Sequence, residues 1–391
     1  MDRIRIGNIA TITRGVSYKK DQANKEKKQD SIALLRANNI DDFKFNYNDL
    51  VFISNSLVSE KQHIKCGDII ISMSSGSKNH VGKVAIAKSD MSCTYGAFCA
   101  KITPAHILPD YLFYVLRSGY FRKHIESCSK GTNINNLKRE YILDFEIPLP
   151  SEQEQQRIVT RIEELFSELD SAVETLQKTK QQLEVYRQAV LKEAFDSIGE
   201  FVPFGTIIES RLGKMLDKEK NTGNPELYLR NINVRWFSFD LSDLLEMRIE
   251  PVEYEKYSLK CGDLVVCEGG EPGRCAVWDK ESTIYYQKAL HRIRFTDGSN
   301  PNFYMYYLWL AAKTGRLNPY YTGTGIKHLT GQSLVKIPVP ICSRTVQDKL
   351  VLKIEYNFSV CDGIEKTINE ALQQAEAMRQ SILKKAFEGN L

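Results

Sequence analysis

The sequence predicts an α+β protein in which two globular domains alternate with two long helices that pair as an antiparallel coiled coil. Three observations support this prediction. Short motifs recur once, in the same order, between 190 and 198 residues further along the chain. Each copy opens with short strand-like runs punctuated by glycine, asparagine and serine, which is typical of an α+β domain. Each copy then closes with a long segment whose apolar residues step by alternating four and three, like a coiled-coil seam.

The repeat fills the whole chain. Lys65-Cys66-Gly67-Asp68 returns as Lys260-Cys261-Gly262-Asp263 at an offset of 195, and Ile147-Pro148-Leu149-Pro150 returns as Ile337-Pro338-Val339-Pro340 at an offset of 190. The other echoes pair Gly7-Asn8-Ile9 with Gly205-Thr206-Ile207, Leu35-Arg36-Ala37-Asn38 with Leu229-Arg230-Asn231-Ile232, Gly131-Thr132-Asn133-Ile134 with Gly323-Thr324-Gly325-Ile326, and Arg187-Gln188 with Arg379-Gln380. Because the order is kept while the offset drifts, we interpret the chain as a tandem duplication with loop insertions and deletions.

The predicted elements divide the chain into four segments: a globular domain over 1–150, a helical spacer over 151–197, a second globular domain over 198–341 and a C-terminal helical spacer over 342–391. Strands are expected at Asp68–Ser72 and Gly82–Ala87, and shorter helices at Pro109–Gly119 and Pro301–Gly315. Each Ile-Pro-x-Pro motif ends a globular domain, because proline removes a backbone donor and biases the preceding residue towards extended backbone.

The segment Ser151–Asp196 contains no proline or glycine and is predicted to form one helix. Its predicted seam comprises Ile158, Ile162, Leu165, Leu169, Leu176, Leu183 and Val190, and that of the second helix comprises Leu350, Ile354, Ile364, Ile368, Met378 and Ile382. A narrow apolar seam on a helix rich in Glu, Gln and Lys must be buried against another helix. We expect the two helices of one chain to pair with each other; homodimerisation through each helix is the alternative.

Composition narrows the possible functions. The chain has 391 residues, 42% of them hydrophobic, and a net charge of +4 from 53 basic and 49 acidic side chains, so any DNA-binding surface must be local. A bilayer helix needs about 20 apolar residues, and no run in the sequence approaches that length. The nine cysteines form no Cys-x-x-Cys pair, so we expect reduced thiols, no metal site and a cytoplasmic location.

This organisation resembles the specificity (S) subunit of type I restriction-modification systems. The resemblance rests on Ile147 through Val159 and Arg187 through Phe195, and on their echoes Ile337 through Val351 and Arg379 through Phe387. In the globular parts, Lys-Cys-Gly-Asp-Ile and Gly-Thr-x-Ile-x-x-Leu resemble recurrent elements of the family's target recognition domains. Ile341-Cys342-Ser343-Arg344-Thr345 departs from the usual polar start of the helix, so the second helix is expected to begin later or to dock less firmly.

The resemblance implies a non-catalytic DNA-recognition subunit. In that family each target recognition domain reads one half of a split double-stranded DNA sequence, while the helices set the spacing and carry two methyltransferase (M) subunits. The M subunits bind S-adenosylmethionine and methylate adenine N6, and restriction (R) subunits, which use ATP and Mg, complete the nuclease. The chain itself is then expected to hold no cofactor and no catalytic residue. Because its two globular copies share a framework of motifs but differ elsewhere, the two half-sites should differ in sequence.

Three pairs of segments carry side chains suited to DNA. Arg and Lys suit guanine, Asn and Gln suit adenine, a glutamate can accept a hydrogen bond from cytosine, and Lys, Ser and Thr suit phosphates. In the first copy the predicted DNA-binding residues are Arg36, Asn38, Ser75, Lys78, Asn79, His80, Lys83, Lys130, Thr132, Asn133 and Asn135. In the second copy they are Arg230, Asn231, Asn233, Glu271, Arg274, Tyr321, Thr322, Thr324, Lys327 and His328. Any single one of these residues is also compatible with an ordinary turn.

Two alternatives of different class remain. One is a coiled-coil protein–protein scaffold that binds no DNA, and the other is the specificity part of a split restriction-methylation enzyme. Asn318-Pro319-Tyr320-Tyr321 resembles the Asn-Pro-Pro-Tyr motif of amino-methyltransferases, but the second proline is missing and no glycine-rich strand–loop–helix is present for the methyl donor. We therefore predict that catalysis resides in partner subunits.

Overall fold

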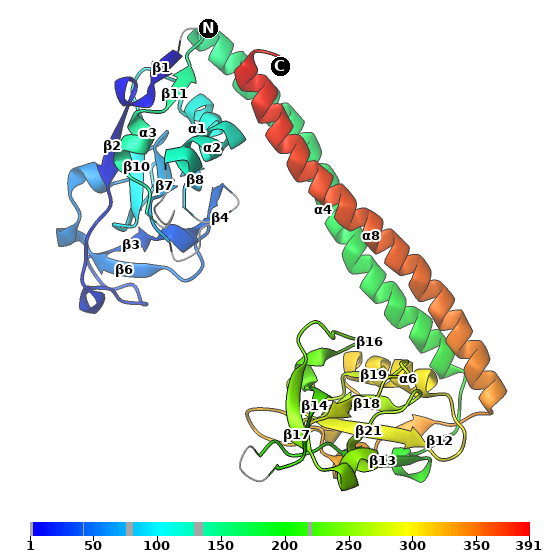
Figure 1. Ribbon diagram of the computed structural model, residues 1–391. Coiled ribbons are helices and arrows are strands. Elements are labelled where there is room, and N and C mark those ends of the chain that lie inside the picture. Colours follow the sequence, from blue (N-terminus) through cyan, green and yellow to red (C-terminus); the bar gives the residue numbers. More distant parts are fainter. Residues whose placement is uncertain (1–2, 42, 76–80, 129–135, 218–220) are drawn as a thin grey trace. The chain divides into compact units, whose positions relative to one another are not determined.

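The computed structural model describes residues 3–41, 43–75, 81–128, 136–217 and 221–391. The chain divides into two compact units (Figure 1): unit 1 comprises Met1–Leu176 with Glu370–Leu391, and unit 2 comprises Gln177–Asn369. Each unit contains one globular part and a portion of both long helices. This division cuts through the helices, so it does not test the four predicted segment boundaries.

Unit 1 is built around two sheets. A four-stranded antiparallel sheet has the order β2 (Ala10–Arg14), β10 (Cys99–Pro104), β7 (Ile69–Ser72), β8 (Val84–Ile86), and a three-stranded sheet has the order β6 (Val51–Ser54), β3 (Ser31–Leu35), β9 (Cys93–Tyr95). Two further strand pairs are β1 (Arg3–Arg5) with β11 (Glu146–Pro148), and β4 (Ile40–Asp41) with β5 (Lys44–Phe45). The helices of this part are α1 (Pro109–Arg117), α2 (Gly119–Cys128) and α3 (Arg139–Leu143).

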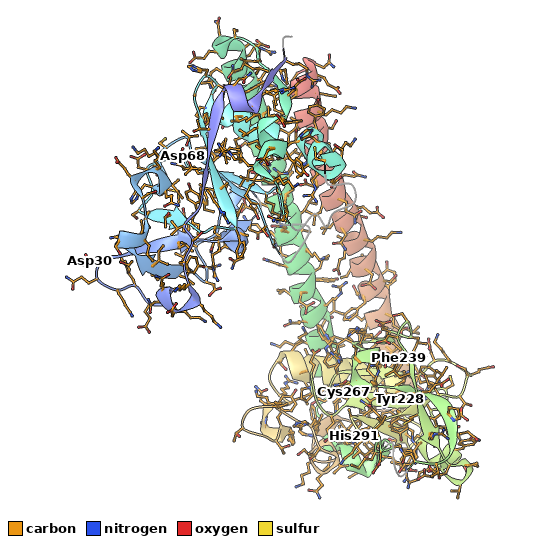
Figure 2. The ribbon with its side chains drawn as sticks, turned by 60° about the vertical axis from the view of Figure 1, so that its left-hand side comes forward. Asp30, Asp68, Tyr228, Phe239, Cys267 and His291 are labelled. Atoms are coloured by element: carbon orange, nitrogen blue, oxygen red, sulfur yellow. The ribbon has the colours of Figure 1, made fainter. Side chains whose placement is uncertain are left out.

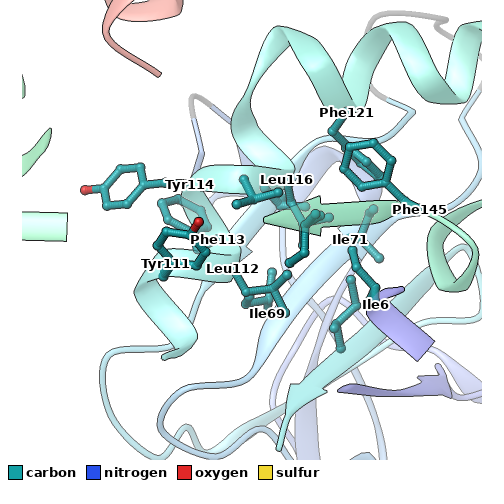
Figure 3. Packing of buried hydrophobic residues seen from close by; sticks show 14 of the residues in the cluster. Ile6, Ile69, Ile71, Tyr111, Leu112, Phe113, Tyr114, Leu116, Phe121 and Phe145 are labelled. Atoms are coloured by element: carbon teal, nitrogen blue, oxygen red, sulfur yellow. The ribbon is translucent and has the colours of Figure 1, made fainter. Parts of the chain in front are cut away.

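Strand β7 is buried on both faces, because its side chains alternate between two hydrophobic cores. Ile69 and Ile71 pack against α1 and α2, as Figure 3 shows, in a core that also receives the end of α8 through Leu383. Ile70 points the other way, into a second core with Leu35. A run of three isoleucines is therefore explained by two-sided burial.

Unit 2 repeats this topology. Its four-stranded sheet has the order β13 (Ile208–Leu212), β21 (Leu290–Phe295), β18 (Leu264–Cys267), β19 (Cys275–Val277), and its three-stranded sheet has the order β17 (Leu245–Ile249), β14 (Asn224–Leu229), β20 (Tyr285–Tyr286). The strand pairs are β12 (Phe201–Pro203) with β22 (Pro338–Pro340), and β15 (Val234–Arg235) with β16 (Ser238–Phe239). The helices are α5 (Tyr254–Tyr257), α6 (Pro301–Lys313) and α7 (Gly331–Leu334). The predicted duplication is thus confirmed as a duplicated fold.

The long helices α4 (Glu152–Asp196) and α8 (Arg344–Glu388) pair antiparallel within each unit. In unit 1, Arg157 donates to the carbonyl of Leu391 at 3.0 Å, and Arg379 forms an ion pair with Asp170 further along α4. In unit 2, Arg187 contacts Asp362 at 2.7 Å, and Lys353 contacts Glu193 at 2.7 Å. Residues further along α4 thus contact residues progressively earlier in α8, as antiparallel helices require. Both helices have 45 residues, so the expectation that the second begins later is wrong.

The predicted seam positions differ in burial. Ile158, Ile162, Leu183, Val190, Ile354, Ile368 and Ile382 are buried, and Leu165, Leu169, Leu176 and Leu350 are partly buried. Ile364 is 41% exposed and Met378 is 52% exposed, so their assignment to the seam is wrong. Their neighbours Glu365 and Arg379 turn inwards instead, where they form the ion pairs that join the helices.

Two findings bear on the predictions from composition. All nine cysteines are free thiols, and burial raises the pKa of Cys99 to about 12, which keeps that thiol protonated. Within the described ranges, no cluster of three metal-ligating side chains is found, and no helix is both long and apolar enough to cross a membrane.

Candidate nucleic-acid interface

The first pair of predicted segments forms a 3-10 turn, Ala37–Asn39 in unit 1, which ends in a buried asparagine. The backbone N–H of Arg36 donates to Asn39 Oδ1 at 2.9 Å, and Asn39 Nδ2 donates to the carbonyls of Asn46 and Asn48, each at 2.9 Å. The side chain is completely buried. It therefore clamps the loop that follows, and the neighbouring Asn38 remains exposed.

Asn233 repeats this clamp in the turn Asn231–Asn233 of unit 2. The N–H of Arg230 donates to Asn233 Oδ1 at 2.9 Å, and Asn233 Nδ2 donates to the carbonyls of Asp240 and Asp243, each at 3.0 Å. Only 1% of Asn233 is exposed. The prediction that Asn233 binds DNA is therefore wrong: its amide belongs to the framework that holds the loop.

Each of the two arginines that precede these clamps forms an ion pair with an aspartate of its own unit. Arg36 Nη2 lies 2.8 Å from Asp49 Oδ2, and Arg230 Nη2 lies 2.7 Å from Asp243 Oδ2. Both guanidinium groups also donate to the backbone carbonyl of the same aspartate. Their charge is therefore shared with a carboxylate, so a phosphate contact from either one would have to compete with that pairing.

The three predicted segments of unit 2 converge into one surface. Arg274 Nη2 donates to the carbonyl of Asn231 at 2.8 Å, which joins the second segment to the first. The hydroxyl of Tyr321 donates to the carbonyl of Pro272 at 3.0 Å, and the N–H of Leu329 donates to the carbonyl of Glu268 at 2.7 Å. These bonds join the third segment to the second, so residues far apart in sequence are held together.

Arg274 and Glu271 have structural roles within this surface. Arg274 Nη1 contacts Glu271 Oε2 at 3.0 Å, and only 15% of the Arg274 side chain is exposed. Trp236 Nε1 donates to Glu271 Oε1 at 2.7 Å, a contact that the sequence did not suggest. Arg274 therefore joins the loops to each other, and its predicted contact with DNA stays a prediction. Glu271 is exposed, but both of its oxygens already accept a hydrogen bond.

The loop between Tyr321 and His328 carries most of the exposed predicted residues of unit 2. The backbones of Thr322 and His328 exchange hydrogen bonds of 2.8 and 2.9 Å, which closes the loop into a short ladder. Thr322, Thr324, Lys327 and His328 are all exposed. Lys327 Nζ lies 5.7 Å from the centre of the Tyr321 ring and, within the part of the chain that the structure describes, forms no ion pair. Lys327 is therefore a cation available to a phosphate.

Unit 1 has the same plan, although several predicted residues fall outside the described ranges. The strand bridge between Ser74 and Asn136 joins its second and third segments, and Leu137 N–H donates to the carbonyl of Met73 at 2.7 Å. Ser75 is partly exposed, and Lys83 Nζ lies 3.2 Å from Asp41. The predicted residues that lie outside the described ranges are Lys78, Asn79, His80, Lys130, Thr132, Asn133 and Asn135.

Phe98 of unit 1 was missed by the sequence reading. It is 68% exposed, and its carbonyl accepts hydrogen bonds from the N–H groups of Met73 at 2.8 Å and Ser74 at 3.2 Å. In unit 2 the carbonyl of Ala289 accepts the corresponding bond from Glu268 at 2.9 Å. An exposed aromatic ring at this turn is therefore specific to unit 1. A lone phenylalanine between apolar strands is most simply read as core, so only the fold reveals it.

A buried polar pair lies beneath the surface of unit 2. His291 on β21 is 2% exposed, and its Nε2 lies 3.2 Å from both Glu268 Oε2 and the carbonyl of Leu329. Burial lowers the pKa of His291, against the opposing effect of the Glu268 carboxylate. Figure 2 shows His291 and the buried Cys267 in this unit. The corresponding position in unit 1 is Ala100, which has no polar side chain.

Comparison with known proteins places both copies in one family. The model of the type I restriction modification DNA specificity domain matches residues 1–185 and 200–374. The EcoKI specificity subunit of Escherichia coli K12 is 31% identical over 408 residues, which cover 99% of this chain and 88% of that protein. The StySPI specificity subunit of Salmonella potsdam is also 31% identical, with the same coverage.

Two solved structures share the fold. A chain from a study of complex assembly and conformational transition of the type I R-M system matches with a TM-score of 0.78 and 16% identity, covering 100% of this chain and 98% of that one. The HsdS subunit of Thermoanaerobacter tengcongensis matches with a TM-score of 0.55 and 18% identity, covering 100% of this chain and 97% of that one. At these identities the match concerns the fold alone.

Proposed function

Because this chain belongs to the type I restriction-modification DNA specificity family, we propose that it is the non-catalytic subunit that reads a split DNA sequence for a methylating complex. Each globular domain reads one half of the target, and the paired helices set the spacing between the halves and dock two M subunits. The four segments 1–150, 151–197, 198–341 and 342–391 are the proposed division of labour between reading and spacing.

One observation carries this proposal. The two units repeat the same framework, down to the clamps made by Asn39 and Asn233, while the loops that these clamps hold carry different side chains. The units also differ at a second turn, where Phe98 of unit 1 corresponds to Ala289 of unit 2, and beneath the surface, where His291 and Glu268 of unit 2 correspond to apolar residues of unit 1. A shared scaffold with unlike loops suits a protein that reads two unlike half-sites.

On its own, this chain presents side chains that are only modestly suited to binding DNA. Lys327, His328, Thr322 and Thr324 can contact phosphates or base edges in unit 2. Other cations, such as Arg230 and Lys83, share their charge with a carboxylate. We therefore propose that stable binding requires the M subunits to close around the DNA.

The partners supply the chemistry. In the proposed complex the M subunits bind S-adenosylmethionine and transfer its methyl group to adenine N6. Where R subunits join, they bring ATP and Mg for cleavage. This chain contributes position and sequence selectivity, and its location with host DNA in the cytoplasm follows from that role.

The test is to co-express this chain with the M subunit encoded beside it and to map methylated adenines across the host genome. The expected result is a motif of two unlike half-sites at fixed spacing. A stable complex that leaves no new methylation would favour the scaffold that binds no DNA. Methylation that persists when this chain is omitted would contradict its role as the reader.

A second arm assigns each half-site to its domain. Exchanging residues 198–341 for the corresponding domain of a relative with a known target should change one half of the methylated motif and leave the other half unchanged. A change in both halves, or in neither, would contradict the assignment of one domain to one half-site.

A further inference from the structure

A short turn joins β9 to β10 in unit 1, and its counterpart joins β20 to β21 in unit 2. This connecting turn consists of Ala97 and Phe98 in unit 1, and of Lys288 and Ala289 in unit 2. It belongs to none of the three pairs of predicted DNA-binding segments. Its hydrogen bonds nevertheless place it among those segments in both units.

The residue before the connecting turn is bonded to the first predicted segment. The N–H of Gly96 donates to the carbonyl of Leu35 at 2.9 Å, and the N–H of Gln287 donates to the carbonyl of Leu229 at 3.1 Å. Each leucine directly precedes the arginine with which the first segment begins. The same backbone contact therefore fixes the start of the turn in both units.

The connecting turn itself is bonded to the second predicted segment. The carbonyl of Phe98 accepts hydrogen bonds from the N–H groups of Met73 and Ser74. The carbonyl of Ala289 accepts the corresponding hydrogen bond from the N–H of Glu268. The second segment is in turn bonded to the third one in both units. The connecting turn therefore lies where the three segments meet.

A glycine allows the preceding sheet strand to approach the connecting turn in each unit. A Cβ atom at Gly15, which follows β2, would lie 2.1 Å from the carbonyl oxygen of Gly96. A Cβ atom at Gly213, which follows β13, would lie 2.3 Å from the carbonyl oxygen of Gln287. Both would be severe clashes, so only glycine permits this close backbone approach. The backbone of the turn is thus held from three sides by contacts that the two units share.

The side chains on this shared backbone differ. Phe98 is 68% exposed, whereas Ala289 in its place is small and partly exposed. Lys288 is exposed and, among the described residues, forms no ion pair, whereas Ala97 stands in its place in unit 1. Each unit therefore projects one long side chain from the turn, which is apolar in unit 1 and cationic in unit 2. A fixed backbone that carries different exposed side chains suits the recognition of different bases.

We propose that the connecting turn contacts base edges in both half-sites. Phe98 contacts the 5-methyl group of a thymine in the half-site of unit 1, and Lys288 donates to O6 and N7 of a guanine in the half-site of unit 2. The thymine methyl is the apolar group on the floor of the major groove, and a lysine suits the two acceptors of guanine. Because the turn lies where the segments meet, its side chains emerge within the surface, where they face bases more readily than the phosphates at the edges of the groove. This inference rests on the proposed function and adds the chemistry of one base pair in each half-site.

Two variants test the proposal in the complex with M subunits, by mapping the methylated motif. Phe98→Ala should reduce the preference for one T·A pair in one half-site about tenfold, and Lys288→Gln should do the same for one G·C pair in the other half-site. Tyr120→Ala is the control for the aromatic ring, because Tyr120 is 46% exposed on α2. Lys280→Gln is the control for the charge. Both controls should leave the motif unchanged, and all four variants should unfold like the unaltered chain because their side chains are exposed.

Modified DNA tests the two contacts atom by atom. Uracil in place of the thymine removes only the 5-methyl group, so it should slow methylation by the unaltered complex about tenfold and have no effect on the Phe98→Ala complex. In the same way, 7-deazaguanine removes the N7 acceptor, so it should slow the unaltered complex several-fold and leave the Lys288→Gln complex unaffected.

Two results would overturn the proposal. One is a split motif that stays the same in both turn variants. The other is a fall in affinity that is uniform across DNA sequences, which would assign the turn to phosphates. Failure of the unaltered complex to methylate any split motif would instead contradict the proposed function.

Discussion

An aspartate occupies the equivalent position of the same turn in both units, but its charged partner differs between them. In the Lys-Cys-Gly-Asp turn, the backbone N–H of Lys65 donates to Asp68 at 2.8 Å, and that of Lys260 donates to Asp263 at 2.8 Å. Asp68 then pairs with buried Lys101 at 3.0 Å, whereas Asp263 pairs with Arg294 through two nitrogens at 2.7 and 2.9 Å.

The comparison separates two kinds of constraint. Backbone geometry is preserved wherever a turn must be fixed, even when the charged partner has been replaced. Surface loops carry no such requirement, so they are free to diverge towards different ligands. The units therefore match most closely in the backbone turns and in the asparagine clamps that fix them, and they differ in some buried charged partners and at the predicted DNA surface. The following variants test how far that equivalence extends.

The largest expected difference concerns the aspartates. Asp68→Asn would leave Lys101, whose side chain is 8% exposed, as a buried charge without its counter-ion. We expect the free energy of unfolding of unit 1 to fall by about 3–5 kcal/mol. Asp263→Asn should cost unit 2 about 1–3 kcal/mol, because Arg294 is 26% exposed and can turn towards water. Hydrogen exchange of peptides from each unit would measure both effects. Equal losses would contradict this difference in burial.

The asparagine clamps should behave alike. Asn39→Ala and Asn233→Ala each remove three hydrogen bonds from a buried site and leave backbone groups without partners. We expect each variant to destabilise its own unit by about 2–4 kcal/mol. Asn38→Ala, at an exposed neighbour, should change stability by less than about 0.5 kcal/mol. If Asn233→Ala kept full stability and lost only DNA binding, Asn233 would instead contact DNA directly.

The large-scale organisation could be predicted because it depends on patterns that are local in sequence. The repeat, the helix that begins near Ser151 and the helix at Pro301–Lys313 all follow from spacing and from proline positions. The exact phase of the seam could not be predicted. Stripes through Met378 or through its neighbour Arg379 both satisfy a four-three pattern, and Arg379 faces inwards because its partner Asp170 lies on the other helix.

The candidate site was predicted less completely for a related reason. Arg274 and Asn233 are the residue types that DNA-binding proteins use, and the same donors can equally hold a loop together. Their partners, Asn231 and Asp243, become visible only when the chain folds back on itself. Trp236 and Phe98 could not be recognised, because a single aromatic residue does not reveal from sequence whether it is buried.

The buried histidine should give unit 2 a pH dependence that unit 1 lacks. Burial lowers the pKa of His291 below its ordinary value of 6.5, so below pH 6.5 the unfolded chain binds the proton more readily than the folded one. Stability is therefore full above pH 6.5 and falls as the pH drops towards the folded pKa, by at most about 1.4 kcal/mol per pH unit.

A variant that copies unit 1 tests this origin. His291→Ala combined with Glu268→Met reproduces the side chains of Ala100 and Met73, and should remove this contribution from unfolding curves measured between pH 5 and pH 8. A slope that persists in the double variant would assign the pH dependence to another group.

The smallest expected effect is the most direct test of the DNA surface. Lys327 is exposed and, among the described residues, forms no ion pair, so Lys327→Gln should remove one phosphate contact without loss of stability. In the complex with M subunits, DNA affinity should fall several-fold, and the slope of log affinity against log salt should decrease by about 1. Lys280→Gln is the matched control, because Lys280 is exposed just beyond the far end of the β18–β19 hairpin. If both variants changed the slope equally, the charge would act at long range, and the loop of Lys327 would not be the surface of unit 2 that contacts DNA.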